Sequence, residues 1–297
     1  MEIQGIIVPI LTPMRPDGSL HSDALSDEIE RLIAAKVHGI FPLGTNGEGY
    51  ILSMEEKEEV LRETVRCVAG RLPVYAGTGC ISTADTVRFS RRAQDFGADA
   101  LSVITPWFAA ASQEELQRHF ETVAKSVSLP LILYNIPART GNALAPATVE
   151  KLANMPNIVG VKDSSGNFDN MLQYIERTRH RPDFSVLSGN DSLILWTLLA
   201  GGKGGVAGCA NVFPRNMVEI YEAFRRGDLN AARQAQDAIR PFRNCFRFGN
   251  PNTIVKTAVG MLGHNVGPCR PPFDGLSQEG RDAVRAVLQD LTGKGVN

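Results

Sequence analysis

The chain has 297 residues, a formal net charge of −1 and a hydrophobic content of 43%. These values describe an ordinary soluble globular protein that is long enough to bury a large core. The balanced charge gives no reason to expect a nucleic acid or a membrane surface as partner. No apolar run approaches the roughly 18 residues that a membrane-spanning helix needs.

Cysteine and histidine residues are scattered along the sequence. The five cysteines form no CxxC pair, so we expect reduced thiols in a cytoplasmic protein. The N-terminus lacks a basic region ahead of an apolar one, and we therefore expect no signal peptide. The five histidines show no metal-ligand spacing, and no nucleotide-binding fingerprint is present, so we expect neither a metal nor a cofactor.

Apolar runs and amphipathic segments alternate along the first three quarters of the chain. The apolar runs predict strands at 5–11, 39–44, 72–77, 100–105, 129–135, 158–162, 184–188 and 205–209. The segments between and after them predict helices at 22–36, 53–68, 82–96, 112–127, 145–154, 167–179, 191–200 and 214–226. Two of these helices start with the capping-box pattern, at Ser53 and at Ser112.

Eight strand–helix units follow one another without a linker. Such alternation, with nearly continuous apolar strands, predicts a parallel sheet covered by helices. Eight units that close on themselves form a (β/α)8 barrel, and residues 1–226 suit its size. A doubly wound open sheet is the alternative. Helical segments near 228–247, 252–263 and 277–292 predict that residues 227–297 pack on the barrel as an appendage, without forming an independent domain.

The active site of such a barrel lies at the C-terminal ends of its strands. Lys162 is the only lysine at these ends, and burying an ammonium costs several kcal/mol unless it is paired or loses its proton. Tyr134 ends the neighbouring strand, and Thr45 carries a hydroxyl that can link polar groups. The glycines of 44–49 let backbone N–H groups converge on an anion.

An amine, a phenol and an anion-binding turn together indicate imine chemistry on a 2-oxo acid. Each group alone has an ordinary structural explanation, such as a snorkelling lysine, a core tyrosine or a tight strand–helix connection. Gly201-Gly-Lys-Gly-Gly205 looks like a phosphate loop, but it precedes the eighth strand and is expected to be structural. The functional prediction therefore depends on several groups meeting on one face.

Short motifs along nearly the whole chain resemble one enzyme family. They are Gly5-x-x-x-Pro9 with Thr12-Pro13, Gly44-Thr-Asn-Gly-Glu48, Tyr134-Asn-Ile-Pro137, Gly160-Val-Lys-Asp163 and Asn250-Pro251. In this order they resemble the dihydrodipicolinate synthase and N-acetylneuraminate lyase family of class I, Schiff-base-forming enzymes. The resemblance implies a barrel with a C-terminal helical segment, a homotetramer, and pyruvate as the keto partner.

The resemblance also implies roles for individual residues. Lys162 matches the Schiff-base lysine, and Tyr134 matches the general acid/base. The remaining matches are to substrate-binding positions: Thr45 and Asn46 for the pyruvate carboxylate, Val206 for a backbone that faces the substrate, and Gly189 with Asp191 for the hydroxyl-binding pair of the sugar-cleaving members.

Departures from the family pattern concern the second substrate. Synthases typically have two adjacent threonines where Thr45 and Asn46 stand. They also have a Thr-Pro-Tyr-Tyr motif whose second tyrosine reaches across a dimer contact to complete a proton relay. Phe108 occupies that position and has no hydroxyl, a loss expected to cost on the order of 10²–10⁴ in rate. Arg139, in contrast, matches the synthase arginine that binds a second carboxylate, and sialic-acid lyases have a hydroxyl-bearing residue where Gly208 stands.

We therefore expect a class I pyruvate-dependent aldolase that cleaves a 2-keto-3-deoxy acid to pyruvate and an aldehyde. Lys162 forms the imine, and Tyr134 coupled to Thr45 moves the proton. The other expected contacts are the carboxylate at Gly44, Asn46 and Gly47, a distal group at Arg139, and substrate hydroxyls at Asn190 and Asp191. Alternatives are dihydrodipicolinate synthase itself, a family dehydratase, a metal-dependent aldolase and a non-catalytic 2-oxo-acid sensor.

Overall fold

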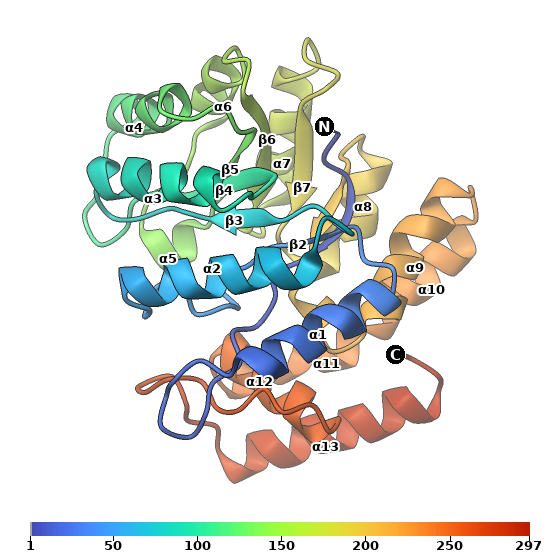
Figure 1. The fold of residues 1–297 in the computed structure, drawn as a ribbon. Helices are drawn as coiled ribbons and strands as arrows, with labels where there is room; N and C mark the ends of the chain where they lie inside the picture. The colour runs from blue at the N-terminus through green and yellow to red at the C-terminus, as the bar shows by residue number, and fades with distance from the viewer. Residues whose placement is uncertain (1) are drawn as a thin grey trace. The chain divides into compact units, whose positions relative to one another are not determined.

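The structure is a computed structural model that describes residues 2–297 (Figure 1). Over these residues it has eight parallel strands, whose order in the sheet is β2-β1-β8-β7-β6-β5-β4-β3. The strands are β1 (Gly5–Val8), β2 (Gly39–Ile40), β3 (Tyr75–Gly77), β4 (Ala100–Ile104), β5 (Leu131–Asn135), β6 (Ile158–Asp163), β7 (Ser185–Ser188) and β8 (Gly204–Val206). Consecutive strands are neighbours in this order except β2 and β3, which stand at its two ends, and β8 lies next to β1. This order confirms the predicted (β/α)8 barrel and excludes the doubly wound alternative.

Helices connect the strands and continue after the last one. They are α1 (Ser22–Ala34), α2 (Met54–Val68), α3 (Thr83–Asp95), α4 (Gln113–Lys125), α5 (Pro137–Thr140), α6 (Pro146–Leu152), α7 (Phe168–Arg177), α8 (Ile194–Leu199), α9 (Pro214–Arg225), α10 (Leu229–Ala238), α11 (Arg240–Asn244), α12 (Pro251–Met261) and α13 (Gln278–Gly293). Short 3₁₀ turns cover Asp191–Leu193, Gly208–Asn211 and Cys245–Phe248. In the described part of the chain, no helix has the length and apolar character needed to cross a membrane.

Local sequence signals explain most helix boundaries. Both predicted capping boxes form: Ser53 with Glu56 starts α2, and Ser112 with Glu115 starts α4. The helix expected at 228–247 is divided into α10, α11 and a 3₁₀ turn. Pro241 lies in the first turn of α11, where its missing N–H and fixed φ are tolerated, whereas it could not continue α10.

Contacts within the chain define two compact units. The first contains residues 2–5 and Pro73–Val206, and the second contains Ile6–Leu72 and Ala207–Asn297. In the first unit, β4, β5 and β6 place fully buried Leu101, Leu133 and Val161 in adjacent strands. The second unit holds β2 and the helices from α9 to α13. The boundary at residues 226 and 227 stays a prediction.

Candidate active site

Strand β6 carries Lys162 between β5 and β7. In the parallel register, Lys162 pairs with Tyr134 of β5 on one side and with Leu187 of β7 on the other. The lysine is 4% exposed, and its Nζ lies 3.7 Å from the centroid of the Tyr134 ring. The predicted pairing of an amine with a phenol at neighbouring strand ends is therefore present.

The buried position changes the acid–base behaviour of this lysine. Loss of solvent disfavours the ammonium form and lowers the pKa of Lys162 below its ordinary value, while the Tyr134 phenol and the Asp191 carboxylate oppose that shift. A lower pKa leaves more of the amine neutral near pH 7, and the neutral amine is the form that attacks a carbonyl.

Gly189 makes room for the lysine side chain. A Cβ added at Gly189 would lie 2.9 Å from Cε of Lys162 and 1.9 Å from Oγ of Ser164, and real side chains do not tolerate such contacts. Ser164 was missed in the sequence, although its place directly after the lysine strand was a usable signal. Its backbone N–H donates to the carbonyl of Asn135 at 2.8 Å, which fixes the chain just beyond β6.

Asn190 and Asp191 follow β7 and start a 3₁₀ turn. The Asn190 side chain accepts a hydrogen bond from the Ser192 N–H at 3.1 Å, so this oxygen caps the turn. Asp191 is 4% exposed and stabilises the charged form of Lys162. Asp191 is thus predicted correctly to lie within electrostatic reach of the lysine.

Asn135 and Asp163 belong to motifs noted in the sequence, but the polar network that they form behind the strand ends was not predicted. The Asn135 amide donates to Asp163 Oδ1 at 2.7 Å, and the Asn135 oxygen accepts from the Leu144 N–H at 3.0 Å. Burial raises the pKa of Asp163, and hydrogen bonds from Ser165 and Asn135 oppose that shift. Because residues alternate across a strand, this network supports Lys162 and Tyr134 from the opposite face.

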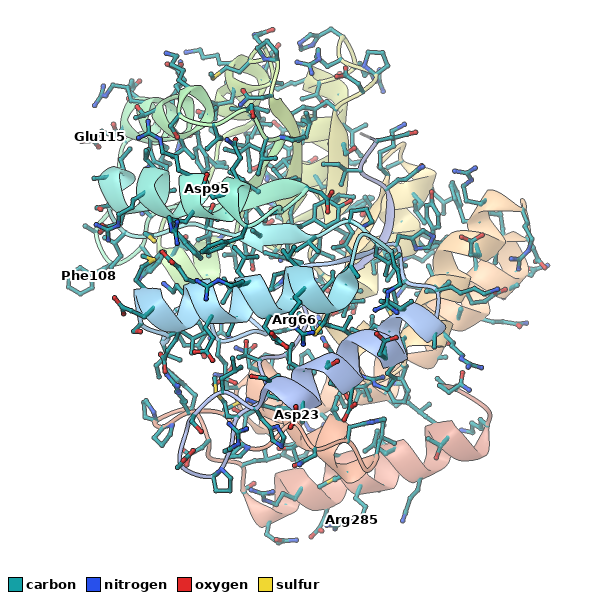
Figure 2. The ribbon with its side chains drawn as sticks, viewed as in Figure 1. Asp23, Arg66, Asp95, Phe108, Glu115 and Arg285 are labelled. Carbon is teal, nitrogen blue, oxygen red and sulfur yellow. The ribbon has the colours of Figure 1, made fainter. Side chains whose placement is uncertain are left out.

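Three other predicted residues occupy separate positions in the first unit. Val206 ends β8 and is 4% exposed, whereas Arg139 is exposed on α5. Phe108 is 96% exposed and has a φ of 82°, an unusual conformation for a bulky residue. Figure 2 shows its ring projecting away from the ribbon.

The glycine-rich turn after β2 belongs to the second unit. A Cβ at Gly47 would lie 2.9 Å from the Ile10 carbonyl oxygen, and one at Gly49 would lie 2.3 Å from that of Leu43. Both positions therefore require glycine. The half-buried residues Thr45 and Asn46 lie ahead of these two glycines, and Gly44 packs against the Phe41 ring. The turn is therefore closely packed, and its predicted role in anion binding stays a prediction.

Two residues that hold this turn were overlooked in the sequence. Asn252 and Lys256 lie on α12, and both contact the turn. Lys256 is the single lysine of a largely apolar helix, and this feature of the sequence could have pointed to a buried, paired charge. Within the described residues, no cluster of three histidine, cysteine or acidic side chains has a metal-binding arrangement.

Comparison with known proteins places these motifs in one family. The model of the dihydrodipicolinate synthetase family matches residues 2–291. The 4-hydroxy-tetrahydrodipicolinate synthase of Methanoculleus marisnigri is 41% identical over 96% of this chain and 98% of its own, and that of Methanopyrus kandleri is 40% identical over 98% and 97%.

Solved structures agree with the sequence relatives. YagE, a prophage protein from E. coli K12 that belongs to the dihydrodipicolinic acid synthase family and was solved in complex with pyruvate, is 34% identical. It superimposes with a TM-score of 0.94, covering 97% of this chain and 98% of its own. The synthase from Methylacidiphilum fumariolicum SolV gives a TM-score of 0.95 at 34% identity, covering 99% and 97%. The chain belongs to the dihydrodipicolinate synthetase family and is an enzyme of the lyase class.

Proposed function

We propose that this enzyme forms an imine between Lys162 and pyruvate or another 2-oxo acid. The observation that carries the proposal is a buried lysine whose pKa is lowered by burial and whose amine lies 3.7 Å from the Tyr134 ring centroid. The pyruvate bound to the E. coli family member supports the choice of keto acid.

The chemistry follows from the electron demand of a protonated imine. The neutral Lys162 amine adds to the C2 carbonyl of a 2-keto-3-deoxy acid, and loss of water gives the iminium ion. Removal of the C4 hydroxyl proton breaks the C3–C4 bond, releases an aldehyde and leaves an enamine. Protonation at C3 and hydrolysis then give pyruvate and the free amine, and we assign these proton transfers to Tyr134.

The turn after β2 is proposed as the carboxylate-binding element. The family match supports roles for Gly44, Thr45, Asn46 and Gly47 in binding the anion. The same match supports coupling of the Thr45 hydroxyl to Tyr134 in proton transfer. Val206 is proposed to present its backbone to the substrate.

Our leading second substrate is the aldehyde half of a keto-deoxy acid. Gly189 and Asp191 border the lysine, and Asp191 is suited to accept a hydrogen bond from a sugar-acid hydroxyl. Asn190 is proposed as a further hydroxyl contact. Phe108 lacks the hydroxyl that the synthase relay uses, which favours cleavage over synthesis.

The synthase reaction, condensation of pyruvate with aspartate semialdehyde, is the second candidate. Two observations favour it: relatives at 40% and 41% identity carry the synthase name, and Arg139 matches the arginine that binds a second carboxylate. A family dehydratase would share the imine, and a sensor would form it without turnover.

Reductive trapping tests the imine. The enzyme is incubated with pyruvate and borohydride, and the adduct is located by peptide mass mapping. We expect a stable mass gain on Lys162, and none on the half-exposed Lys203. Absence of an adduct contradicts the imine mechanism, and inhibition by a chelator would instead favour a metal-dependent aldolase.

A panel of substrates tests which second substrate the enzyme uses. Product release from keto-deoxy acids is measured beside condensation with aspartate semialdehyde. Efficient condensation would place the synthase reaction ahead of aldol cleavage. Phe108→Tyr restores the missing hydroxyl, so it should raise synthase activity by on the order of 10²-fold if that relay is limiting. An unchanged rate would show that Phe108 does not determine the reaction.

We also propose a cytoplasmic homotetramer, as the family resemblance implies. The exposed apolar side chains of Leu172, Trp196 and Leu199 on α7 and α8 support contacts with another copy of the chain. Their contribution is tested by the oligomeric mass.

A further inference from the structure

A buried ion pair anchors the end of the turn after β2. Lys256 Nζ lies 2.7 Å from Glu48 Oε1, and the two side chains are 1% and 0% exposed. Lys256 also donates to the Thr12 carbonyl at 2.8 Å, and Glu48 Oε2 accepts from the Arg270 N–H at 2.9 Å. Both charges are therefore paired and further hydrogen-bonded, which burial requires.

A second contact from the same helix reaches the start of the turn. Asn252 lies four residues before Lys256 on α12, so the two side chains share one helix face. The Asn252 Nδ2 donates to the Thr45 carbonyl at 2.6 Å. Helix α12 thus contacts the turn at two points, the Thr45 carbonyl and the Glu48 carboxylate. Asn46 and Gly47 lie between these two points.

The turn has a backbone that needs such support. Leu43 has a φ of 64° and Glu48 a φ of 56°, both in the left-handed region that non-glycine residues rarely adopt. Conformations of this kind persist where the surrounding structure over-determines them. A buried ion pair is seldom more stabilising than an apolar substitute, so stability alone is a weak reason for it.

We propose that Asn252 and Lys256 are positioning residues that hold the Gly44–Gly49 turn in the geometry that receives the substrate carboxylate. The inference rests on the proposed function, because it assigns that turn to the carboxylate. The two residues act through the Thr45 carbonyl and the Glu48 side chain, without touching the substrate. A carboxylate contact is made equally in the bound substrate and in the transition state. Displacing the turn should therefore raise KM, and kcat should fall by a smaller factor, to the extent that the Thr45 hydroxyl moves with the turn.

The assay follows only pyruvate. An imine that tautomerises to the enamine exchanges the C3 protons of pyruvate with solvent, so exchange in D₂O followed by NMR gives KM and kcat without an aldehyde partner. We expect Asn252→Ala to raise KM for pyruvate about tenfold, a misplacement effect of modest size, and to lower kcat by a smaller factor.

Asn216→Ala is the matched control. Its Nδ2 donates to the Ala235 carbonyl at 2.9 Å, so it is also an amide-to-carbonyl bond between segments of the second unit, but it joins α9 to α10. The control should leave KM unchanged. An equal rise in both variants would show a general loss of order and would overturn the inference.

The ion pair is tested with both charges removed together. Lys256→Met alone leaves the Glu48 carboxylate buried without its cation and risks misfolding, whereas Glu48→Gln with Lys256→Met keeps similar volumes and leaves no charge. We expect this double variant to show the same rise in KM, with folding checked by its unfolding midpoint. If the double variant does not fold, Asn252→Ala alone tests the inference.

The outcomes separate the two proposals. If wild-type enzyme gives no borohydride adduct on Lys162, the proposed function fails and the inference fails with it. If wild-type enzyme gives the adduct but Asn252→Ala exchanges pyruvate protons with unchanged KM, the inference is overturned and the imine mechanism stands.

Discussion

Burial of Lys162 lowers the stability of the folded chain but makes its amine more reactive. Burial lowers its pKa from the ordinary 10.5, and Tyr134 and Asp191 only partly compensate. The lowered pKa gives Lys162 a larger fraction of neutral, nucleophilic amine than an exposed lysine has, because an exposed lysine is almost fully protonated near physiological pH. The fold thus accepts a cost at this position, a common feature of active sites.

Adduct formation should therefore rise with pH and reach half its plateau at a pH below 10.5. The neutral amine is the reactive form, and its fraction increases as pH passes through the lowered pKa. The measurement is the initial rate of borohydride trapping with saturating pyruvate, from pH 6 to pH 11. A midpoint at or above 10.5 would contradict the role assigned to burial.

The same shift predicts how stability depends on pH. Between the lowered pKa and 10.5, the unfolded chain binds a proton at Lys162 that the folded chain does not bind. Stability therefore increases with pH in that window. Wild-type enzyme should gain free energy of unfolding relative to Lys162→Met between pH 7 and pH 10 in urea titrations. A constant difference would show that the two states have the same pKa.

Gly189 offers a test of the space around the amine. Gly189→Ala would place a Cβ 2.9 Å from Lys162 Cε and 1.9 Å from Ser164 Oγ, so the lysine must move. A displacement of about 1 Å costs on the order of 10² in rate, and we expect that loss in adduct formation. Adding Ser164→Ala removes the shortest clash and should recover part of the rate. Full activity in Gly189→Ala would show that the lysine position is not constrained there.

At the scale of elements, patterns along the chain predicted element type better than element length. The apolar run 39–44 predicted a six-residue strand, but β2 covers only Gly39–Ile40. Leu43 takes a left-handed conformation where the chain turns, and apolar character alone does not reveal such a turn. Helix α5 was not predicted, because Pro137–Thr140 is too short for a helical period to be seen.

Site residues on neighbouring strands could be predicted from the sequence, whereas contacts between distant segments could not. Lys162 and Tyr134 were placed together because consecutive strands of a barrel are neighbours, and the β5–β6 register confirms it. Asn252 and Lys256 were not predicted because they lie more than 200 positions from the turn that they contact. Only the packing of α12 in the second unit reveals that contact.

For the whole molecule, the question is how copies of the chain associate. Large apolar side chains are exposed on α7 and α8, where Leu172, Trp196 and Leu199 are 40%, 44% and 48% exposed. Exposed apolar side chains of this size are common at the sites where protein chains associate. In the proposed homotetramer, a second copy of the same chain covers these apolar side chains.

Trp196→Glu should therefore lower the oligomeric mass, from a tetramer to a smaller species. A carboxylate introduced at the centre of an apolar contact is desolvated without a partner, which costs several kcal/mol on each side. Light scattering coupled to gel filtration measures the mass of wild-type and variant enzyme. Leu229→Glu is the matched control, because Leu229 is 49% exposed on α10, outside this surface, and the same charge there should leave the mass unchanged. A monomeric wild-type enzyme would refute the tetramer, and an unchanged mass in Trp196→Glu would move the association surface elsewhere.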